Sequence, residues 1–242
     1  MPLEDNIKEE KQRIRERMWK LLERKDVARF PKPVKGRIPN FKDSEKAAMK
    51  LIAHYVFKRA RVVFVCPDSP QRTVREYVLR SGKTLVMATP RLREGFLVLT
   101  PDFIPRGKER EASTIRGAFR YGRRLDYLDI KVDLKVTGSV AVTVKGARLG
   151  KGGGYSDLEY AILRELKVID ERTPVVTTVH DLQIVNELPL EPHDVPLDYI
   201  FTPTKIIEVK EPIKEKPKGL IRDLLDERKI QEIPLLKRIL AK

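Results

Sequence analysis

Apolar residues near the start of the chain recur with the period of a helix. Residues such as Met18 and Leu22 appear at three- and four-residue steps, and charged residues fill most positions between them. This spacing predicts an amphipathic helix over residues 3–27. Three prolines then favour extended chain, because proline interrupts helices. We expect a second helix to begin at Asp43 or Ser44, both of which are typical capping residues, and to carry Tyr55 on its inner face.

From about residue 61 the pattern changes to short apolar runs that alternate with amphipathic segments. Residues 61–66 (RVVFVC) form a β-branched run of the kind found in buried parallel strands. This alternation predicts an α/β layered fold with a mostly parallel sheet. The predicted strands are 61–66, 84–88, 96–100, 135–144 (broken at Gly138) and 174–179, and the predicted helices are 70–81, 111–122 and 156–167.

The character of the chain changes again after about residue 204. Residues 210–219 (KEPIKEKPKG) are charged and contain prolines, which indicates a linker. Residues 219–241 fit two short amphipathic helices. We therefore divide the chain into a domain over 1–204 and a linker with helices over 205–242. We expect these helices to pack back on the domain, with a partner-binding tail as the alternative.

Composition narrows the class of protein. The 242 residues include 50 Lys and Arg against 35 Asp and Glu, a net charge of +15, and a single cysteine. Intramolecular disulfides are thereby excluded. Neither a membrane-spanning apolar run nor a secretory signal is evident, so we expect a cytoplasmic protein without membrane association. The basic excess fits nucleic acid, a phosphorylated small ligand or a solvated surface equally well.

A glycine-rich segment carries the clearest chemical signal. Five glycines fall within nine residues at 146–154, between a predicted strand and a predicted helix. Glycine lets backbone N–H groups approach a ligand, and the helix that follows would direct its positive end there. With Arg148 and Lys151 added, we interpret the loop as a phosphate cradle rather than a flexible surface loop. Asp157 would either bridge to phosphate through Mg²⁺ or cap the helix.

The loop sequence GARLGKGGGYSD (146–157) resembles the signature of the ATP-dependent 5-formyltetrahydrofolate cyclo-ligases. Three further segments resemble the same family: KQRIR over 11–15, which fits the family's K-x-x-L-R, GKTLVMATP over 82–90, and LEPHDVPLDYIFTPT over 190–204. The resemblance covers about residues 8–204. RIPNF and TVHDLQIV are similar to a divergent branch of the family.

The resemblance implies a fold, a reaction and a set of residues. The fold is a three-layer α/β sandwich like that of ribose-5-phosphate isomerase and the CoA transferases. The reaction converts 5-formyltetrahydrofolate, a reduced formyl-pterin, to 5,10-methenyltetrahydrofolate with ATP and Mg²⁺. The implied ATP-binding residues are Lys11, Arg15, Arg148, Leu149, Gly150, Lys151, Gly152, Gly153, Gly154 and Tyr155. Arg148 and Lys151 are the implied catalytic residues, Asp157 and Asp194 the metal ligands, and Tyr155 and Asp68 the substrate-binding residues.

Three departures from the family pattern bear on the substrate. Ser156 stands where the family has a second tyrosine, Leu158 where many members have arginine, and Asp68 is the nearest match to the folate-side glutamate. The alternative is therefore a nucleotide-binding protein of this fold that lacks turnover or uses another substrate, and binds nucleic acid or a protein through a basic surface. Its oligomeric state stays open. The densest basic cluster comprises Arg106, Lys108, Arg110, Arg116, Arg120, Arg123 and Arg124. We expect Arg116, Arg120 and Arg123 to share one helix face, because they lie at four- and three-residue steps.

Overall fold

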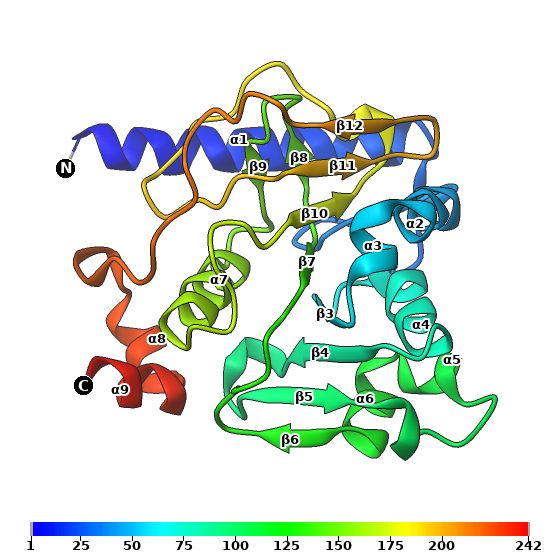
Figure 1. Ribbon diagram of the computed structural model, residues 1–242. Coiled ribbons are helices and arrows are strands. Elements are labelled where there is room, and N and C mark those ends of the chain that lie inside the picture. The colour runs from blue at the N-terminus through cyan, green and yellow to red at the C-terminus, as the bar shows by residue number, and fades with distance from the viewer. Residues whose placement is uncertain (1, 242) are drawn as a thin grey trace.

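A computed structural model describes residues 2–241, with side chains from Asn6 onward. Within this part of the chain the centre is an eight-stranded sheet (Figure 1). Five neighbouring strands are parallel, and the three outer ones pair antiparallel. In spatial order the strands are β12 (Ile206–Glu208), β11 (Tyr199–Phe201), β10 (Val175–Thr178), β7 (Leu134–Thr137), β3 (Val62–Val65), β4 (Thr84–Ala88), β5 (Phe96–Leu99) and β6 (Arg123–Leu125).

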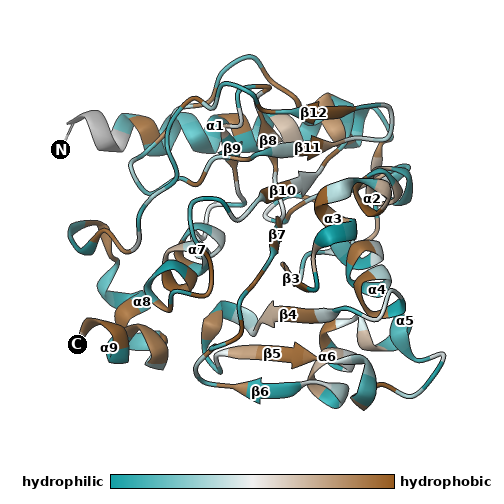
Figure 2. Ribbon diagram, in the orientation of Figure 1, coloured by the Kyte–Doolittle hydropathy of each residue, from teal (hydrophilic) through white to brown (hydrophobic). Residues whose placement is uncertain are grey.

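Helices cover both faces of this sheet, which confirms the predicted mixed α/β architecture with a mostly parallel sheet. One face carries α2 (Ser44–Ala53), α3 (Tyr55–Arg59), α4 (Arg72–Arg80), α5 (Glu109–Ala112) and α6 (Ile115–Tyr121), and the other carries α7 (Tyr155–Glu165) and α9 (Pro234–Leu240). Because both faces are covered, the central strands are almost continuously apolar. The strands β4 and β5 are correspondingly brown in Figure 2.

The first helix belongs to a separate apolar cluster. α1 (Pro2–Arg24) packs on a hairpin of β8 (Ala141–Val142) and β9 (Arg148–Leu149), near the pair β1 (Ala28–Arg29) and β2 (Asn40–Phe41). Trp19 is buried there and donates its indole N–H to the carbonyl of Arg37 at 3.0 Å. This packing fixes the rotation of α1, so Arg15 faces the segment that follows β9.

Three predicted elements are interrupted. The helix expected over 111–122 is two helices, because Thr114 starts a new one by accepting the N–H of Gly117 at 2.9 Å. The extended backbone of His54 separates α2 from α3. The strand expected over 135–144 ends at Thr137, and the chain then enters the β8–β9 hairpin.

The segment after residue 204 contributes to the body of the protein. β12 pairs with β11, and α8 (Glu227–Glu232) leads into α9. Ile233, Leu235 and Leu236 are buried in the largest apolar cluster. The second expected helix, α9, thus packs back on the domain. The first, expected on Leu220, Leu224 and Leu225, is instead a short 3-10 turn over Arg222–Leu224, because the helix begins only after the cap at Asp226. The division at residue 204 stays a prediction. None of the helices among the described residues has the length and apolar character needed to cross a membrane.

Candidate functional site

The glycine loop lies against the carboxyl ends of β3 and β7. The register pairs Val65 with Val136, so both strands end at the same edge of the sheet. Two contacts tie the loop region to this edge: Lys151 Nζ donates to Asp68 Oδ1 at 2.9 Å, and the hydroxyls of Thr137 and Ser156 lie 2.5 Å apart. Ligands of open α/β sheets bind at this edge. A separate cavity, of about 640 Å³, lies at the opposite edge, among Tyr55, Asp133 and Asp198.

The conformation of the loop requires glycine at two positions. Gly152 and Gly154 have positive φ angles, 107° and 64°, which side chains with a Cβ rarely adopt. Gly154 is the N-cap of α7, and neighbouring side chains approach both residues. A Cβ at Gly152 would lie 3.7 Å from Cζ of Arg15. The loop is therefore a fixed turn flanked by a cation rather than an open surface loop.

Two cations of α1 reach the site at different points. Arg15 donates its Nε–H to the carbonyl of Gly150 at 2.8 Å. Lys11, which is buried, lies 2.5 Å from Asp194 Oδ2 and 2.8 Å from Glu191 Oε2. Burial opposes ionisation of Glu191, but the hydrogen bond from Lys11 and the attraction of nearby positive charges together outweigh it, so the pKa of Glu191 is lowered. α1 thus contacts both the glycine loop and residues 190–198, the acidic segment that precedes β11.

Arg148 and Asp157 form a buried ion pair behind the loop. The guanidinium of Arg148 bonds Asp157 Oδ1 and donates to the carbonyl of Gly138 at 3.2 Å, and the N–H of Val195 donates to the same carboxylate oxygen at 3.1 Å. Burial opposes both charges, yet their mutual attraction prevails. The pKa of Asp157 is lowered and that of Arg148 is raised. The pair therefore stays ionised and links α7, β9 and the acidic segment.

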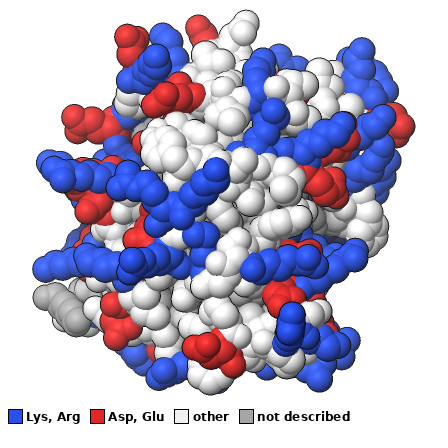
Figure 3. Space-filling model, turned by 45° about the vertical axis from the view of Figure 1, so that its right-hand side comes forward, with Lys and Arg blue, Asp and Glu red and all other residues white. Residues whose placement is uncertain are grey.

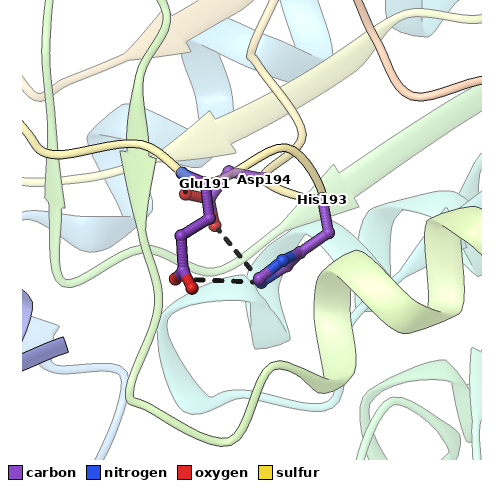
Figure 4. Close-up of side chains that lie close together, drawn as sticks. All are labelled: Glu191, His193 and Asp194. Carbon is purple, nitrogen blue, oxygen red and sulfur yellow. Dashed lines mark hydrogen bonds and ion pairs between the residues drawn. The ribbon is translucent and has the colours of Figure 1, made fainter. Parts of the chain in front are cut away.

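The acidic segment holds a compact group that could bind a cation. Glu191, His193 and Asp194 each place one potential ligand atom within 4.8 Å of the others. Figure 4 shows the imidazole of His193 turned toward both carboxylates, at 4.0 Å from Glu191 and 3.9 Å from Asp194. The ammonium of Lys11 already contacts both carboxylates. A metal ion would have to compete with this cation.

A second buried pair lies beneath the site. Lys135 of β7 and Glu159 of α7 are 3.6 Å apart, and the Lys135 ammonium lies 4.7 Å from the ring centroid of Phe64. Burial lowers the pKa of Lys135 and raises that of Glu159. Sequence reasoning missed this pair and Glu191. Lys135 could have been found from the sequence, because a lysine in a predicted buried strand indicates a buried charge that needs a partner.

The structure brings most of the predicted site residues to one region. Leu149 is buried in the α1 cluster and supports the loop from below. Tyr155 begins α7, and its ring centroid lies 5.3 Å from Nζ of Lys229, a residue that sequence reasoning did not select. Asp157 lies in the first turn of α7, not at its cap. The catalytic, metal and substrate roles of all these residues stay predictions.

The basic cluster lies away from the loop, and one expectation about it is wrong. Arg123 does not share a helix face with Arg116 and Arg120, because the extended backbone of Gly122 ends α6 and places Arg123 in β6. Arg120 pairs with Glu111 at 3.0 Å. Figure 3 shows basic side chains spread over the visible face and interspersed with acidic ones.

Comparison with known proteins supplies the family. A family model described as the 5-formyltetrahydrofolate cyclo-ligase family matches residues 7–203. The chain belongs to the 5-formyltetrahydrofolate cyclo-ligase family. The match contains every predicted site residue, from Lys11 to Asp194. It ends before β12, so the C-terminal segment of this cyclo-ligase family member lies outside it.

The relatives fall into two groups. The chain is 42% identical over 235 residues to the methenyltetrahydrofolate synthase domain-containing protein of Bos taurus, and 43% identical over 235 residues to that of Mus musculus. Each alignment covers 95% of this chain, which spans only 61% and 63% of the two relatives. The 5-formyltetrahydrofolate cyclo-ligase of Escherichia coli K12 is 36% identical over 89 residues, 35% of this chain and 46% of that protein.

A solved structure supports the fold of this family member. The NMR structure of Aquifex aeolicus 5,10-methenyltetrahydrofolate synthetase is similar with a TM-score of 0.53 and 19% sequence identity. It covers 85% of this chain and 96% of its own. At that identity the similarity supports the shared fold alone.

Proposed function

We propose that the protein is an ATP- and Mg²⁺-dependent 5-formyltetrahydrofolate cyclo-ligase. In this reaction the γ-phosphoryl group passes from ATP to the formyl oxygen of the substrate, and ADP is released. N10 then bonds to the formyl carbon and loses its proton, and phosphate leaves with the oxygen to give 5,10-methenyltetrahydrofolate. Beyond family membership, one observation carries the proposal: Arg15 bonds the carbonyl of Gly150, so a cation of α1 and the glycine loop face the same space.

Such chemistry needs positioning and charge neutralisation rather than a protein nucleophile. The composition of the site agrees, because burial raises the pKa of the Cys66 thiol to about 12. We assign Arg15 and Lys151 to the phosphate groups. Arg148 is buried and paired with Asp157. It would therefore act by fixing the shape of the loop and by contributing positive electrostatic potential beneath it.

The donor set fits an Mg²⁺ ion that arrives with the nucleotide better than a resident ion. Asp157 and Asp194 remain the proposed ligands, since Mg²⁺ takes one or two carboxylates together with phosphate oxygens. Each carboxylate already neutralises a protein cation, Arg148 and Lys11 respectively. Bound Mg²⁺ would supply charge for the phosphate oxygens. We expect Lys11 to shift when the ion binds.

The residues proposed to bind the pterin depart most from the family pattern. Ser156 is bonded to Thr137 and provides no aromatic wall for a pterin. Asp68 is paired with Lys151, and we propose that nucleotide binding draws Lys151 away and frees Asp68 for the pterin. Tyr155 then provides the remaining aromatic surface.

The deciding assay combines the protein, ATP, Mg²⁺ and 5-formyltetrahydrofolate and follows methenyl absorbance together with ADP release. We expect product from the wild type and a fall in kcat/KM of about 100-fold for Lys151→Ala, the usual effect of losing one group that stabilises transition-state charge. Lys145→Ala is the matched control, because Lys145 is exposed just before the loop. A wild type that binds ATP but forms no methenyl product contradicts the proposal.

Nucleic-acid binding by the basic cluster is the second candidate. α6 exposes Phe119 beside Arg116 and Arg120, and an aromatic ring among cations can stack on a base. Binding of single-stranded RNA and DNA would be measured across a salt series, where the affinity should fall steeply as salt rises. A flat salt response or undetectable binding removes this candidate.

A further inference from the structure

The C-terminal segment reaches the glycine loop through one lysine. Lys229 of α8 places Nζ 5.3 Å from the ring centroid of Tyr155, and a Cβ at Gly154 would lie only 2.9 Å from that nitrogen. Figure 1 shows α8 beside α7 on the same side of the sheet. The family match ends at residue 203, so this contact brings a residue from outside the matched region to the loop.

Packing holds this lysine in place. Ile233, Leu235 and Leu236 directly after α8 are buried in the largest apolar cluster. Before α8, the N–H of Leu220 donates to Glu165 at 2.9 Å. The segment between these anchors also encloses a cavity of about 70 Å³ that reaches Asp157 and His193. The position of Lys229 is therefore set by packing on both sides.

The ammonium of Lys229 lacks the partners that other lysines of this segment have. Lys214 donates to the carbonyls of Glu191 and Pro192, and Lys216 lies 2.7 Å from Asp198. Among the side chains described, those of residues 6–241, the Lys229 ammonium has neither a hydrogen-bond nor an ion-pair partner, and it contacts the ring of Tyr155. It is half-buried, and burial lowers its pKa. Asp226 and Asp157 oppose this shift from a distance but do not pair with the ammonium. A desolvated cation without a direct partner is costly, so an anionic ligand that contacts it would relieve this cost.

Three cations from three segments converge on the loop. Arg15 comes from α1 and Lys151 from the loop itself, and Lys229 comes from α8. Arg15 and Lys151 already bond protein oxygens, whereas Lys229 does not. We propose that Lys229 is a phosphate-binding residue of the nucleotide site, and that the C-terminal segment forms one wall of that site. This inference rests on the proposed function, since it takes ATP to be the ligand of the loop.

The test compares binding of ATP and adenosine by calorimetry in the wild type, Lys229→Gln, Lys229→Arg and Arg228→Gln. Loss of a hydrogen bond to a charged group should weaken ATP binding about 10-fold or more in Lys229→Gln, with adenosine binding unchanged. Lys229→Arg should retain most of the affinity. Arg228 is the matched control, because it lies on the same helix and is exposed.

Several outcomes would overturn the inference. ATP affinity equal to wild type in Lys229→Gln overturns it, and so does an equal loss of ATP and adenosine binding, which would indicate a packing role. Thermal unfolding of each variant should match the wild type, which separates binding from folding. A wild type that binds ATP with the expected variant effects but makes no methenyl product contradicts the proposed function alone. A wild type that binds no ATP overturns both.

Discussion

Single residues beneath the glycine loop carry charges that the fold has taken out of water. Lys135 and Glu159 are both buried, and Lys135 Nζ and Glu159 Oε2 make no hydrogen bond with the described part of the chain. Their separation of 3.6 Å gives attraction without good hydrogen-bond geometry. In such pairs the attraction between the charges barely offsets the free energy lost on removing them from water. The pair therefore contributes little net stability, although each member depends on the other.

A double-mutant cycle tests this dependence. Lys135→Met or Glu159→Leu alone should lower the free energy of unfolding by about 3–5 kcal/mol, because each leaves an unpaired buried charge. The double variant should be close to wild type or more stable. Urea denaturation provides the measurement. Additive losses in the double variant would show that the pair is strongly stabilising.

Acid should weaken the fold through two paired carboxyls. The pKa values of Asp157 and Glu191 are lowered in the folded state. A lowered pKa means that the unfolded chain binds more protons in acid, so this stability is present above about pH 5 and is lost as the pH falls below about 4. The melting temperature, followed from pH 7 to pH 2.5, should drop in that range.

Replacing one ion pair should flatten this pH dependence. The variant Arg148→Met with Asp157→Leu removes one titrating carboxyl, so its melting temperature should change less between pH 5 and pH 2.5. Asp102→Asn is the control, because Asp102 is exposed and should keep the wild-type profile. Equal pH profiles in all three proteins would contradict the role given to Asp157.

The sequence predicted which residues gather at the site better than it predicted how they pair. Lys11 and Asp194 are 183 positions apart, yet they lie in contact, as the resemblance implied for one site. Their direct ion pair could not be foreseen, because pairing depends on the rotation of α1 over the hairpin. Lys229 was missed for the same reason: its position is set by the packing of α9, not by a local motif.

Elements were predictable in proportion to their length and periodicity. The strand over 84–88 and the helix expected over 156–167 match β4 and α7 closely. The strands β8 and β9 are two residues each, too short for a periodic signal. The break between α5 and α6 depends on the Thr114 hydroxyl, which accepts the N–H of Gly117 and caps α6, in competition with continued helix.

The element that anchors the C-terminal segment is α9. Leu236 is fully buried, so Leu236→Ala should lower the free energy of unfolding by about 2–5 kcal/mol through loss of packing and the cavity left behind. Leu224 precedes α8 and is 43% exposed. Leu224→Ala should therefore change stability by no more than about 0.5 kcal/mol. Equal effects in guanidinium denaturation would mean that α9 is not an anchor.

Over the whole molecule, the basic residues that give the net charge of +15 lie in three kinds of environment. Arg15, Lys151 and Lys229 gather at the loop, while Lys11 and Arg148 neutralise buried acids. Many others lie on the surface among acidic side chains, as Figure 3 shows for one face. This distribution explains why charge alone could not separate a phosphate ligand from nucleic acid. The loop, with its fixed geometry, favours the phosphate ligand.

If ATP joins α1, the glycine loop and α8, its binding should be visible across the molecule. At 100 times the dissociation constant it should stabilise the fold by about 2.7 kcal/mol, and omission of Mg²⁺ should reduce this gain. Hydrogen exchange with ATP should slow together around Arg15, over 150–158 and over 219–232, because one ligand restrains all three. Residues 106–124 serve as the internal control and should exchange at the same rate. Protection confined to 150–158 would show that α1 and the C-terminal segment take no part in binding.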